Sequence, residues 1–235
     1  MNQTTKDKCP YCGGRGMKVL PSDGEVIVEG RRVSNESSAL CICTLNTYVS
    51  DKFERLSGIG NVAGEDAISV AKTLPMRDTV LYGSEALFLY VVKCVIVMHI
   101  PYGMRFAVVT GADVAEKYAM AQPTGVIPTV DLLTPMDLVA MLCVAKVNNR
   151  AIGPGTQEVL ANRERARKPT WIYAPDAASL AESKEMAAEE GRASPIEDIR
   201  RWPSHVLEDL FPKMDALRNA ASRTAKRSQS IAADM

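Results

Sequence analysis

The fold is decided by the stretch Thr79-Val-Leu-Tyr-Gly-Ser-Glu-Ala-Leu-Phe-Leu-Tyr-Val-Val-Lys-Cys-Val-Ile-Val-Met-His-Ile100. Its first four residues form the short β-branched and apolar run that strands favour, and residues 84–100 are apolar over a length that suits a helix. The next segment, Arg105-Phe-Ala-Val-Val-Thr110, is again strand-like. A strand, a helix and a second strand in this order are typical of the βαβ unit of a parallel sheet.

The same alternation continues along the chain. Further helices are predicted at residues 112–120 and 156–167, and further strands at 138–145 and 169–175. Strands that are apolar throughout and separated by helices indicate a parallel sheet covered on both faces. We therefore predict an α/β fold with a doubly wound parallel sheet, followed by charged helices, the last of which begins near His205.

The composition is that of an ordinary globular chain. Of 235 residues, 46% are hydrophobic and 24% are charged, and 28 acidic side chains balance 28 basic ones. Neutrality removes the general electrostatic argument for nucleic-acid binding, so any such binding must depend on local patches. The first residues lack the apolar core of a signal peptide, which predicts a cytoplasmic protein with reduced thiols.

One segment, residues 86–100, could be mistaken for a membrane span. It is shorter than the roughly 20 apolar residues that cross a bilayer, and it contains Lys93 and His99. We therefore predict a buried helix in this segment and no membrane partner.

Four cysteines form two pairs near the N-terminus. The first pair lies in Cys9-Pro-Tyr-Cys12-Gly-Gly-Arg-Gly16, and the second is Cys41-Ile-Cys43. A CxxC pair on a tight turn directs two thiolates to one side, and the glycines allow the positive φ angles that such a turn needs. Two such pairs supply the tetrahedral set that Zn²⁺ prefers. Cys9, Cys12, Cys41 and Cys43 are therefore predicted to bind a structural zinc ion with no open position for a substrate.

These patterns divide the chain into four parts. We predict a zinc-binding module over residues 1–50, with a strand hairpin at 24–30, and a linker with a short helix over 51–76. The α/β domain with its C-terminal helices is expected to occupy residues 77–222. The last part, residues 223–235, is basic and rich in small residues, and is predicted to be a flexible tail.

The order of these parts resembles a known family. A CxxCxGxG turn closed by CxC, followed by a linker and a parallel α/β domain, is similar to the DnaC/DnaI/IstB-like family of AAA+ helicase loaders, particularly to versions from phages. Residues 162–173 resemble that family's passage from an Arg-bearing helix through Lys-Pro-Thr into an apolar strand. Leu81-Tyr-Gly83 stands where the family's phosphate loop begins, and residues 103–114 resemble the strand and helix start that follow. An unrelated α/β fold is the competing explanation.

Three parts of that family's ATP site are missing from this sequence. A phosphate loop needs glycines, a lysine and a Ser/Thr hydroxyl, but Gly83 is followed by Ser84-Glu85, and Lys93 lies nearly three helical turns further on. Ala145-Lys146 replaces the acidic pair that would hold Mg²⁺. Pro175 stands where the family has a polar residue. We therefore expect an AAA+-like scaffold without ATP hydrolysis.

The resemblance implies a DNA-replication accessory protein. In the family, the N-terminal region engages the replicative helicase, and the AAA+ domains assemble into a spiral on single-stranded DNA. The expected partners are therefore a replicative helicase or another replication protein, single-stranded DNA and further copies of the chain. Basic residues are the candidate contacts because Lys and Arg neutralise phosphates; the alternative is that they form solvated surfaces. These residues are Arg15, Lys18, Arg31, Arg32, Arg163, Arg165, Arg167 and Lys168.

Two other functions stay open. The first is an adaptor or inhibitor that binds a host or phage protein through the zinc module, which shares most sequence features with the loader hypothesis. The second is an enzyme with a site at the carboxyl ends of the strands, where the candidates are Thr110, Asp113, Asn148 and Asn149. Catalysis has little support because the sequence lacks GxSxG, HExxH or a comparable signature.

Overall fold

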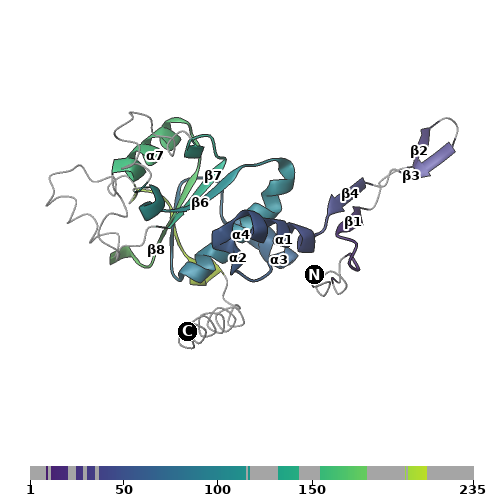
Figure 1. Ribbon diagram of the computed structural model, residues 1–235, viewed down its shortest axis with the longest axis horizontal. Coiled ribbons are helices and arrows are strands. Elements are labelled where there is room, and N and C mark those ends of the chain that lie inside the picture. Colours follow the sequence, from purple (N-terminus) through teal and green to yellow (C-terminus); the bar gives the residue numbers. More distant parts are fainter. Residues whose placement is uncertain are drawn as a thin grey trace.

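The computed structural model of the chain describes residues 9, 12–20, 25–28, 31–34, 37–114, 116, 132–142, 154–178, 199 and 201–210. Within these residues, a five-stranded sheet forms the centre of the molecule (Figure 1). Helices pack on both faces of the sheet, and two antiparallel strand pairs lie near the N-terminus (Figure 1).

The central sheet is parallel throughout, as the alternation of strands and helices predicted. Its strands follow the order β6-β7-β8-β5-β9, and each neighbouring pair is parallel. The strands are β5 (Thr79–Tyr82), β6 (Phe106–Thr110), β7 (Leu138–Leu142), β8 (Thr170–Ala174) and β9 (Ser204–Val206). Every residue of β7 and β8 is buried. Burial on both faces explains why β7 is apolar throughout and why β8 is apolar after Thr170.

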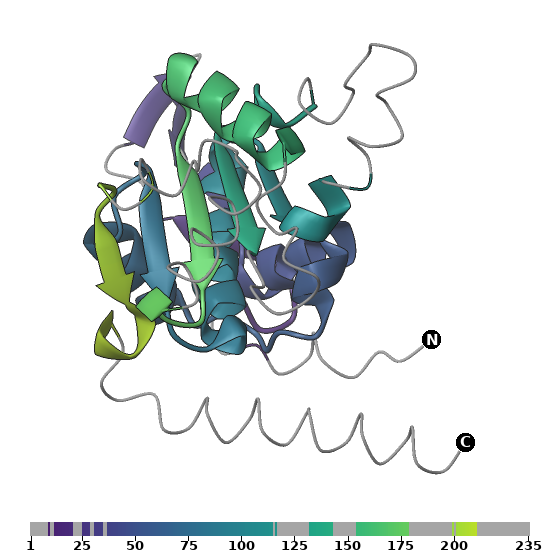
Figure 2. The same ribbon diagram turned by 90° about the vertical axis from the view of Figure 1, so that its left-hand side faces the viewer.

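Side chains that alternate along the strands build a core on each face of the sheet. Leu81, Trp171 and Tyr173 face one core, together with the apolar residues of helix α4. Val80 and Ile172 face the other, together with Val159 of helix α7. Figure 2 shows α7 in front of the strands and the N-terminal helices behind them. The predicted doubly wound arrangement is confirmed.

Helix α4 (Glu85–His99) is the buried helix that the sequence predicted. By length and composition alone, Glu85–Tyr102 could span a membrane. In the structure, however, the ten consecutive residues Phe88–Val97 are buried inside the protein. The helix begins where the Ser84 hydroxyl accepts a hydrogen bond from the Leu87 N–H, an N-cap of the usual kind. A short 3-10 helix, η2 (Ile100–Tyr102), ends it at Gly103.

Three helices precede the sheet and pack on α4. They are α1 (Ile42–Lys52), α2 (Glu54–Ser57) and α3 (Gly64–Thr73). The sequence predicted one short helix here, whereas the structure has three, and they contribute Val49, Leu56 and Val70 to the core. Polar anchors are buried in this layer. Asn46 exchanges hydrogen bonds with the backbone of Val62.

The end of the described chain differs from the prediction. Residues 204–206 form β9, which pairs with β5 in the register Tyr82↔Val206. The helix predicted from about His205 is confirmed as α10 (Leu207–Leu210), but it begins at Leu207 because residues 204–206 form a strand that the sequence did not predict. The other face of the sheet carries α7 (Pro154–Arg165). The predicted domain limits at residues 50, 76 and 222 stay predictions.

The N-terminal strands form two ribbons. Strand β1 (Met17–Leu20) pairs with β4 (Ser37–Leu40), and β2 (Glu25–Val28) pairs with β3 (Arg31–Ser34), both antiparallel. The predicted hairpin between the cysteine pairs is therefore confirmed. The predicted tail 223–235 lies outside the described residues.

Candidate metal centre and the turn after strand β5

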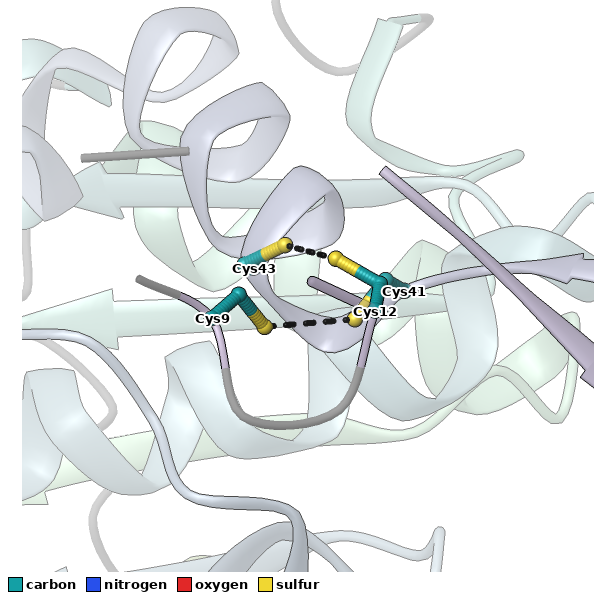
Figure 3. Close-up of side chains that lie close together, drawn as sticks. All are labelled: Cys9, Cys12, Cys41 and Cys43. Carbon is teal, nitrogen blue, oxygen red and sulfur yellow. Dashed lines mark hydrogen bonds between the residues drawn. The ribbon is translucent and has the colours of Figure 1, made fainter. Parts of the chain in front are cut away.

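The four predicted metal ligands come together in the structure. Cys9 and Cys12 lie on the turn before β1, while Cys41 and Cys43 lie at the start of α1 (Figure 3). The Cys9 and Cys41 Sγ atoms are 3.7 Å apart, those of Cys12 and Cys43 are 3.6 Å apart, and all four lie within 4.8 Å of one another. A tetrahedral Zn²⁺ with Zn–S distances of about 2.3 Å places its sulfurs about 3.8 Å apart. The four thiols therefore fit a zinc ion.

The backbone around the first pair explains this geometry. Gly13, Gly14 and Gly16 all have positive φ, as predicted for a tight metal-binding turn. The Gly16 N–H points at the Cys12 Sγ at 3.4 Å, and the Cys41 N–H donates to the Gly16 carbonyl at 2.9 Å. A Cβ on Gly16 would lie 3.0 Å from the Thr44 Oγ1. The pairing of β1 with β4 then carries the second cysteine pair back to the first.

The pKa values of the thiols are shifted in opposite directions within the cluster. Burial raises the pKa of Cys12, but hydrogen bonds from the Gly16 N–H and the other thiols outweigh it and lower that pKa to about 6. Burial raises the pKa of Cys41 to about 12 and also raises that of Cys43. Without a metal, one thiolate is thus stabilised at the expense of its neighbours. A bound dication reverses this because it favours the thiolate form of every ligand.

Apart from Arg163, the predicted contact residues divide into three groups. Arg15, Arg165 and Arg167 are exposed, as a contact surface requires. Lys168 is partly exposed and forms an ion pair with Asp137 at 2.7 Å. The remaining group lies outside the residues whose side chains the structure describes, and consists of Lys18, Arg31 and Arg32.

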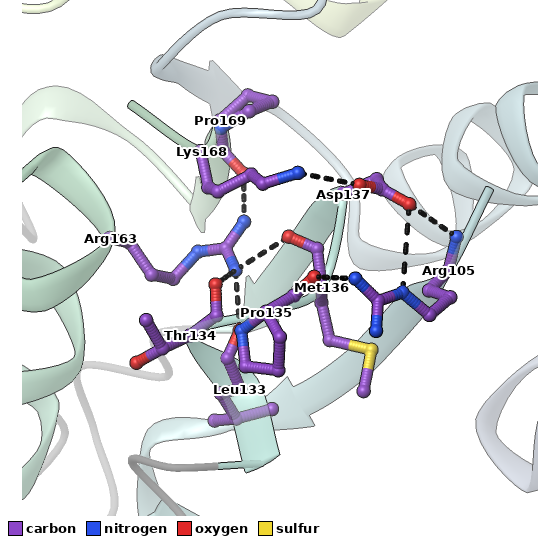
Figure 4. A network of polar contacts seen from close by, with 9 residues as sticks. All are labelled: Arg105, Leu133, Thr134, Pro135, Met136, Asp137, Arg163, Lys168 and Pro169. Carbon is purple, nitrogen blue, oxygen red and sulfur yellow. Dashed lines mark hydrogen bonds and ion pairs between the residues drawn. The ribbon is translucent and has the colours of Figure 1, made fainter. Parts of the chain in front are cut away.

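Arg163 is the exception, because the expectation that it is exposed is wrong. Its side chain is fully buried beneath α7. Its guanidinium donates to four main-chain carbonyls (Figure 4). It also donates to one hydroxyl. The acceptors are the carbonyls of Leu133, Thr134, Met136 and Pro169 and the Thr170 Oγ1. Arg163 therefore connects α7 by hydrogen bonds to the segment before β7 and to the start of β8. Its buried guanidinium cannot contact a partner molecule.

The candidates for an enzymatic site have structural partners. The Thr110 N–H donates to the Asp113 Oδ2 at 2.9 Å, and the Asp113 N–H donates to the Thr110 Oγ1 at 3.0 Å. Two such reciprocal bonds cap the helix that follows β6. Asp113 also forms an ion pair with Arg55 at 2.6 Å. Asn148 and Asn149 lie outside the described residues.

The turn between β5 and α4 is the second place of functional interest. Strand β5 leads to α4 on one face of the sheet, whereas β7 is followed by α7 on the other. The carboxyl ends of strands at such a change of direction are where open α/β sheets bind ligands. The resemblance puts the start of a phosphate loop at this turn.

A carboxylate from the far end of the described chain occupies this turn. The Ser84 N–H donates to the Glu208 Oε1 at 3.2 Å. From the side of β8, the Tyr173 hydroxyl donates to the Gly83 carbonyl at 3.0 Å. Burial, and then the carboxylates of Glu85, Glu208 and Asp176, raise the pKa of Tyr173 to about 12. The sequence contained no local signal for Glu208, because 124 positions separate it from Ser84.

Lys93 does not reach this turn. Its side chain is fully buried on α4. The Nζ donates to the Ser50 Oγ and to the Ile59 carbonyl, both at 2.8 Å. Burial lowers the pKa of Lys93. Lys93 thus joins α4 to the N-terminal helices, and its two described hydrogen bonds are to Ser50 and Ile59, not to residues of the turn.

Comparisons with known proteins give a limited result. No protein-family model matches the chain, and no curated protein matches it. One similar solved structure is the replication initiator DnaA bound to AMPPCP and single-stranded DNA, with 13% identity, a TM-score of 0.44 and coverage of 68% of this chain and 49% of that chain. AMPPCP-bound DnaA from Aquifex aeolicus has 10% identity and a TM-score of 0.39, covering 72% and 64% of the two chains. The chain thus spans about half the length of the first structure.

Domain III of the Thermotoga maritima replication initiation protein DnaA is a further similar structure. It has 14% identity and a TM-score of 0.36, covering 63% of this chain and 78% of that chain. At such identities, the likeness concerns the fold alone.

Proposed function

We propose that the protein is a DNA-replication accessory protein of the helicase-loader type that acts without hydrolysing ATP. It binds a replicative helicase or another replication protein, and it contacts single-stranded DNA. The proposal starts from the sequence resemblance. The most specific part of the proposal is action without ATP hydrolysis. One structural observation supports it: the Glu208 carboxylate lies at the turn where the resemblance places phosphate.

The chemistry of the turn argues against a nucleotide. Phosphate binding at a helix start depends on free N–H groups and on nearby positive charge. Here the Ser84 N–H is hydrogen-bonded to Glu208, and the Ser84 hydroxyl is used as the cap of α4. Glu85 adds a second carboxylate in the first turn of the helix. The lysine on α4, Lys93, is hydrogen-bonded elsewhere.

The cysteine cluster supports action through protein contacts. Four thiolates close the coordination shell of Zn²⁺, so the ion has a structural role. Next to the cluster, Met17 and Leu40 are cross-strand partners in the β1–β4 ribbon, and they are 46% and 50% exposed. Apolar side chains exposed side by side are suited to a protein partner.

The same observation favours a second candidate function. An adaptor or inhibitor that binds a host or phage protein through the zinc module would use the same exposed pair, Met17 and Leu40. The two candidates differ in the partner. The proposed accessory protein binds the replicative helicase or another replication protein, whereas an adaptor or inhibitor binds a host or phage protein outside replication.

Metal analysis and binding assays test the proposal. The purified protein should contain close to one zinc per chain, and Cys41→Ser should lose it. Cys94→Ala is the matched control, because Cys94 is a buried cysteine of α4 outside the cluster. Structural zinc contributes on the order of 10 kcal/mol to folding in small zinc domains, so the loss should also unfold the N-terminal region. Protein without zinc would refute the metal centre.

Two binding measurements test the remaining parts. Calorimetry with ATP·Mg should show no saturable heat, and tight binding would restore an active ATPase. A replicative helicase should be retained by the immobilised protein and released when Met17 and Leu40 are both replaced by Ser, with zinc content unchanged. Retention of a protein unrelated to replication, without the helicase or another replication protein, would favour the adaptor.

A further inference from the structure

The start of helix α4 is already occupied by a group from the same chain. We propose that Glu208 is an internal ligand of the β5–α4 turn, whose carboxylate fills the anion-accepting start of α4 and closes it to anions from solution. This inference deepens the proposed function at the same turn, although it needs neither the zinc ion nor a replication partner.

The Glu208 carboxylate lies close to both Gly83 and Ser84. The Glu208 Oε1 accepts the Ser84 N–H at 3.2 Å. A Cβ on Gly83 would lie 2.8 Å from the same oxygen and closer still to Oε2. Gly83 has a φ of 132°, a conformation that side chains rarely adopt. Glycine is thus the residue that lets the backbone and the carboxylate approach so closely.

The sheet explains how Glu208 reaches the turn. Strand β9 lies beside β5, and Val206 is the register partner of Tyr82. The chain then enters α10, where Leu207 is buried in the core on the α4 side of the sheet. Glu208 follows directly, at the level of the residues after Tyr82. The pairing of the edge strand therefore positions the carboxylate.

The electrostatics favour an internal anion over an external one. The aligned peptides of a helix give its start a partial positive charge, and α4 is 15 residues long. One carboxylate at this position is stabilised. Two more, those of Glu85 and Asp176, lie close enough to act with Glu208 on the Tyr173 hydroxyl. A second anion would meet all three negative charges, which is unfavourable at short range.

Thermal unfolding of two variants tests the assignment. Glu208→Ala removes the carboxylate, and Asp209→Ala is the matched control on the exposed neighbour. Loss of a group that satisfies a helix start should lower the Tm by roughly 2–4 °C, whereas the control should leave it unchanged. Replacing chloride by sulfate at constant ionic strength should then raise the Tm of Glu208→Ala more than that of wild type or control, because the opened turn accepts an anion.

A third variant separates charge from contact. Glu208→Gln keeps an oxygen that can accept the Ser84 N–H, so it should lose less stability than Glu208→Ala and show no sulfate response beyond that of the control. Equal Tm values for Glu208→Ala and Asp209→Ala, or an equal sulfate response in all proteins, would overturn the assignment. Binding of ATP at the turn of the wild type would overturn both this assignment and the proposed function, whereas protein without zinc or without a replication partner would contradict the proposed function alone, so the two failures are distinguishable.

Discussion

Replacement of Arg163 by alanine should be among the most destabilising single changes in the α/β part of the protein. The side chain is fully buried and makes five hydrogen bonds. Two of these bonds, to the Leu133 carbonyl and the Thr170 Oγ1, are buried entirely. Alanine removes every donor at once and leaves a cavity under α7.

The size of the effect follows from the acceptors. Each buried acceptor left without a donor costs about 1–3 kcal/mol, so the two fully buried ones alone cost about 2–6 kcal/mol. Burying the charged guanidinium is itself unfavourable, because burial lowers the pKa of Arg163 to about 10. Its removal offsets part of the loss. We expect the free energy of unfolding to fall by about 3–5 kcal/mol, the range for a broken buried network.

Urea unfolding followed by circular dichroism measures this change. Arg165→Ala is the control, because Arg165 lies on the same helix, is exposed and donates one side-chain bond, to Asn162. It should change the free energy of unfolding by no more than about 0.5 kcal/mol. Arg163→Lys should fall between the two, since an ammonium has three donors and lacks the planar fork. A loss below about 1 kcal/mol in Arg163→Ala would refute the reasoning.

Two further predictions concern pH. The Lys168 ammonium, and then the Arg105 N–H, hold the pKa of Asp137 below its usual range. The contribution of the Asp137 carboxylate to the free energy of unfolding is therefore complete above about pH 4, and it is lost as the pH falls through the lower pKa of the folded state. Asp137→Asn should therefore cost up to about 1 kcal/mol near neutral pH and less in acid, by urea unfolding at both pH values. Burial lowers the pKa of Lys93 from 10.5 in the folded protein. Between the folded-state and unfolded-state pKa values, the unfolded chain therefore binds more protons than the folded one, so the free energy of unfolding should rise with pH across that window. Lys93→Met should lack this rise, and parallel curves for both proteins would contradict the prediction.

The elements that the sequence predicted correctly are those with a local pattern. Strands β7 and β8 are buried on both faces, so their positions are apolar except for Thr170, whose hydroxyl accepts a hydrogen bond from Arg163. Helix α4 combines a serine cap with a long apolar run, and the cysteine turn carries its own glycines. In each case, the physical requirement acts on neighbouring residues and is therefore visible in a short window.

The features that the sequence missed depend on distant partners. Strand β9 is short and contains Ser204 and His205, and an edge strand with exposed positions shows no apolar run. The spacing of Arg163 and Arg167 puts both on one helix face, which is typical of a solvated surface or of a contact between subunits. The burial of Arg163 depends on carbonyls about 30 positions earlier in the chain. Glu208 is the extreme case, because only the pairing of β9 with β5 brings it to Ser84.

The metal centre and the closed turn are connected through packed helices. Cys41 and Cys43 start α1, and α1 is joined to α4 by the bond from Lys93 to Ser50. A zinc ion would fix the first turn of α1 and, with it, the direction in which the β1–β4 ribbon leaves the domain. At the other end of this connection, Glu208 holds the start of α4 in one arrangement without a ligand. Packed cores change between discrete states and do not deform gradually. Under the proposed function, the α/β domain is therefore a fixed support, and the partner surface beside the zinc ion is presented without a nucleotide switch.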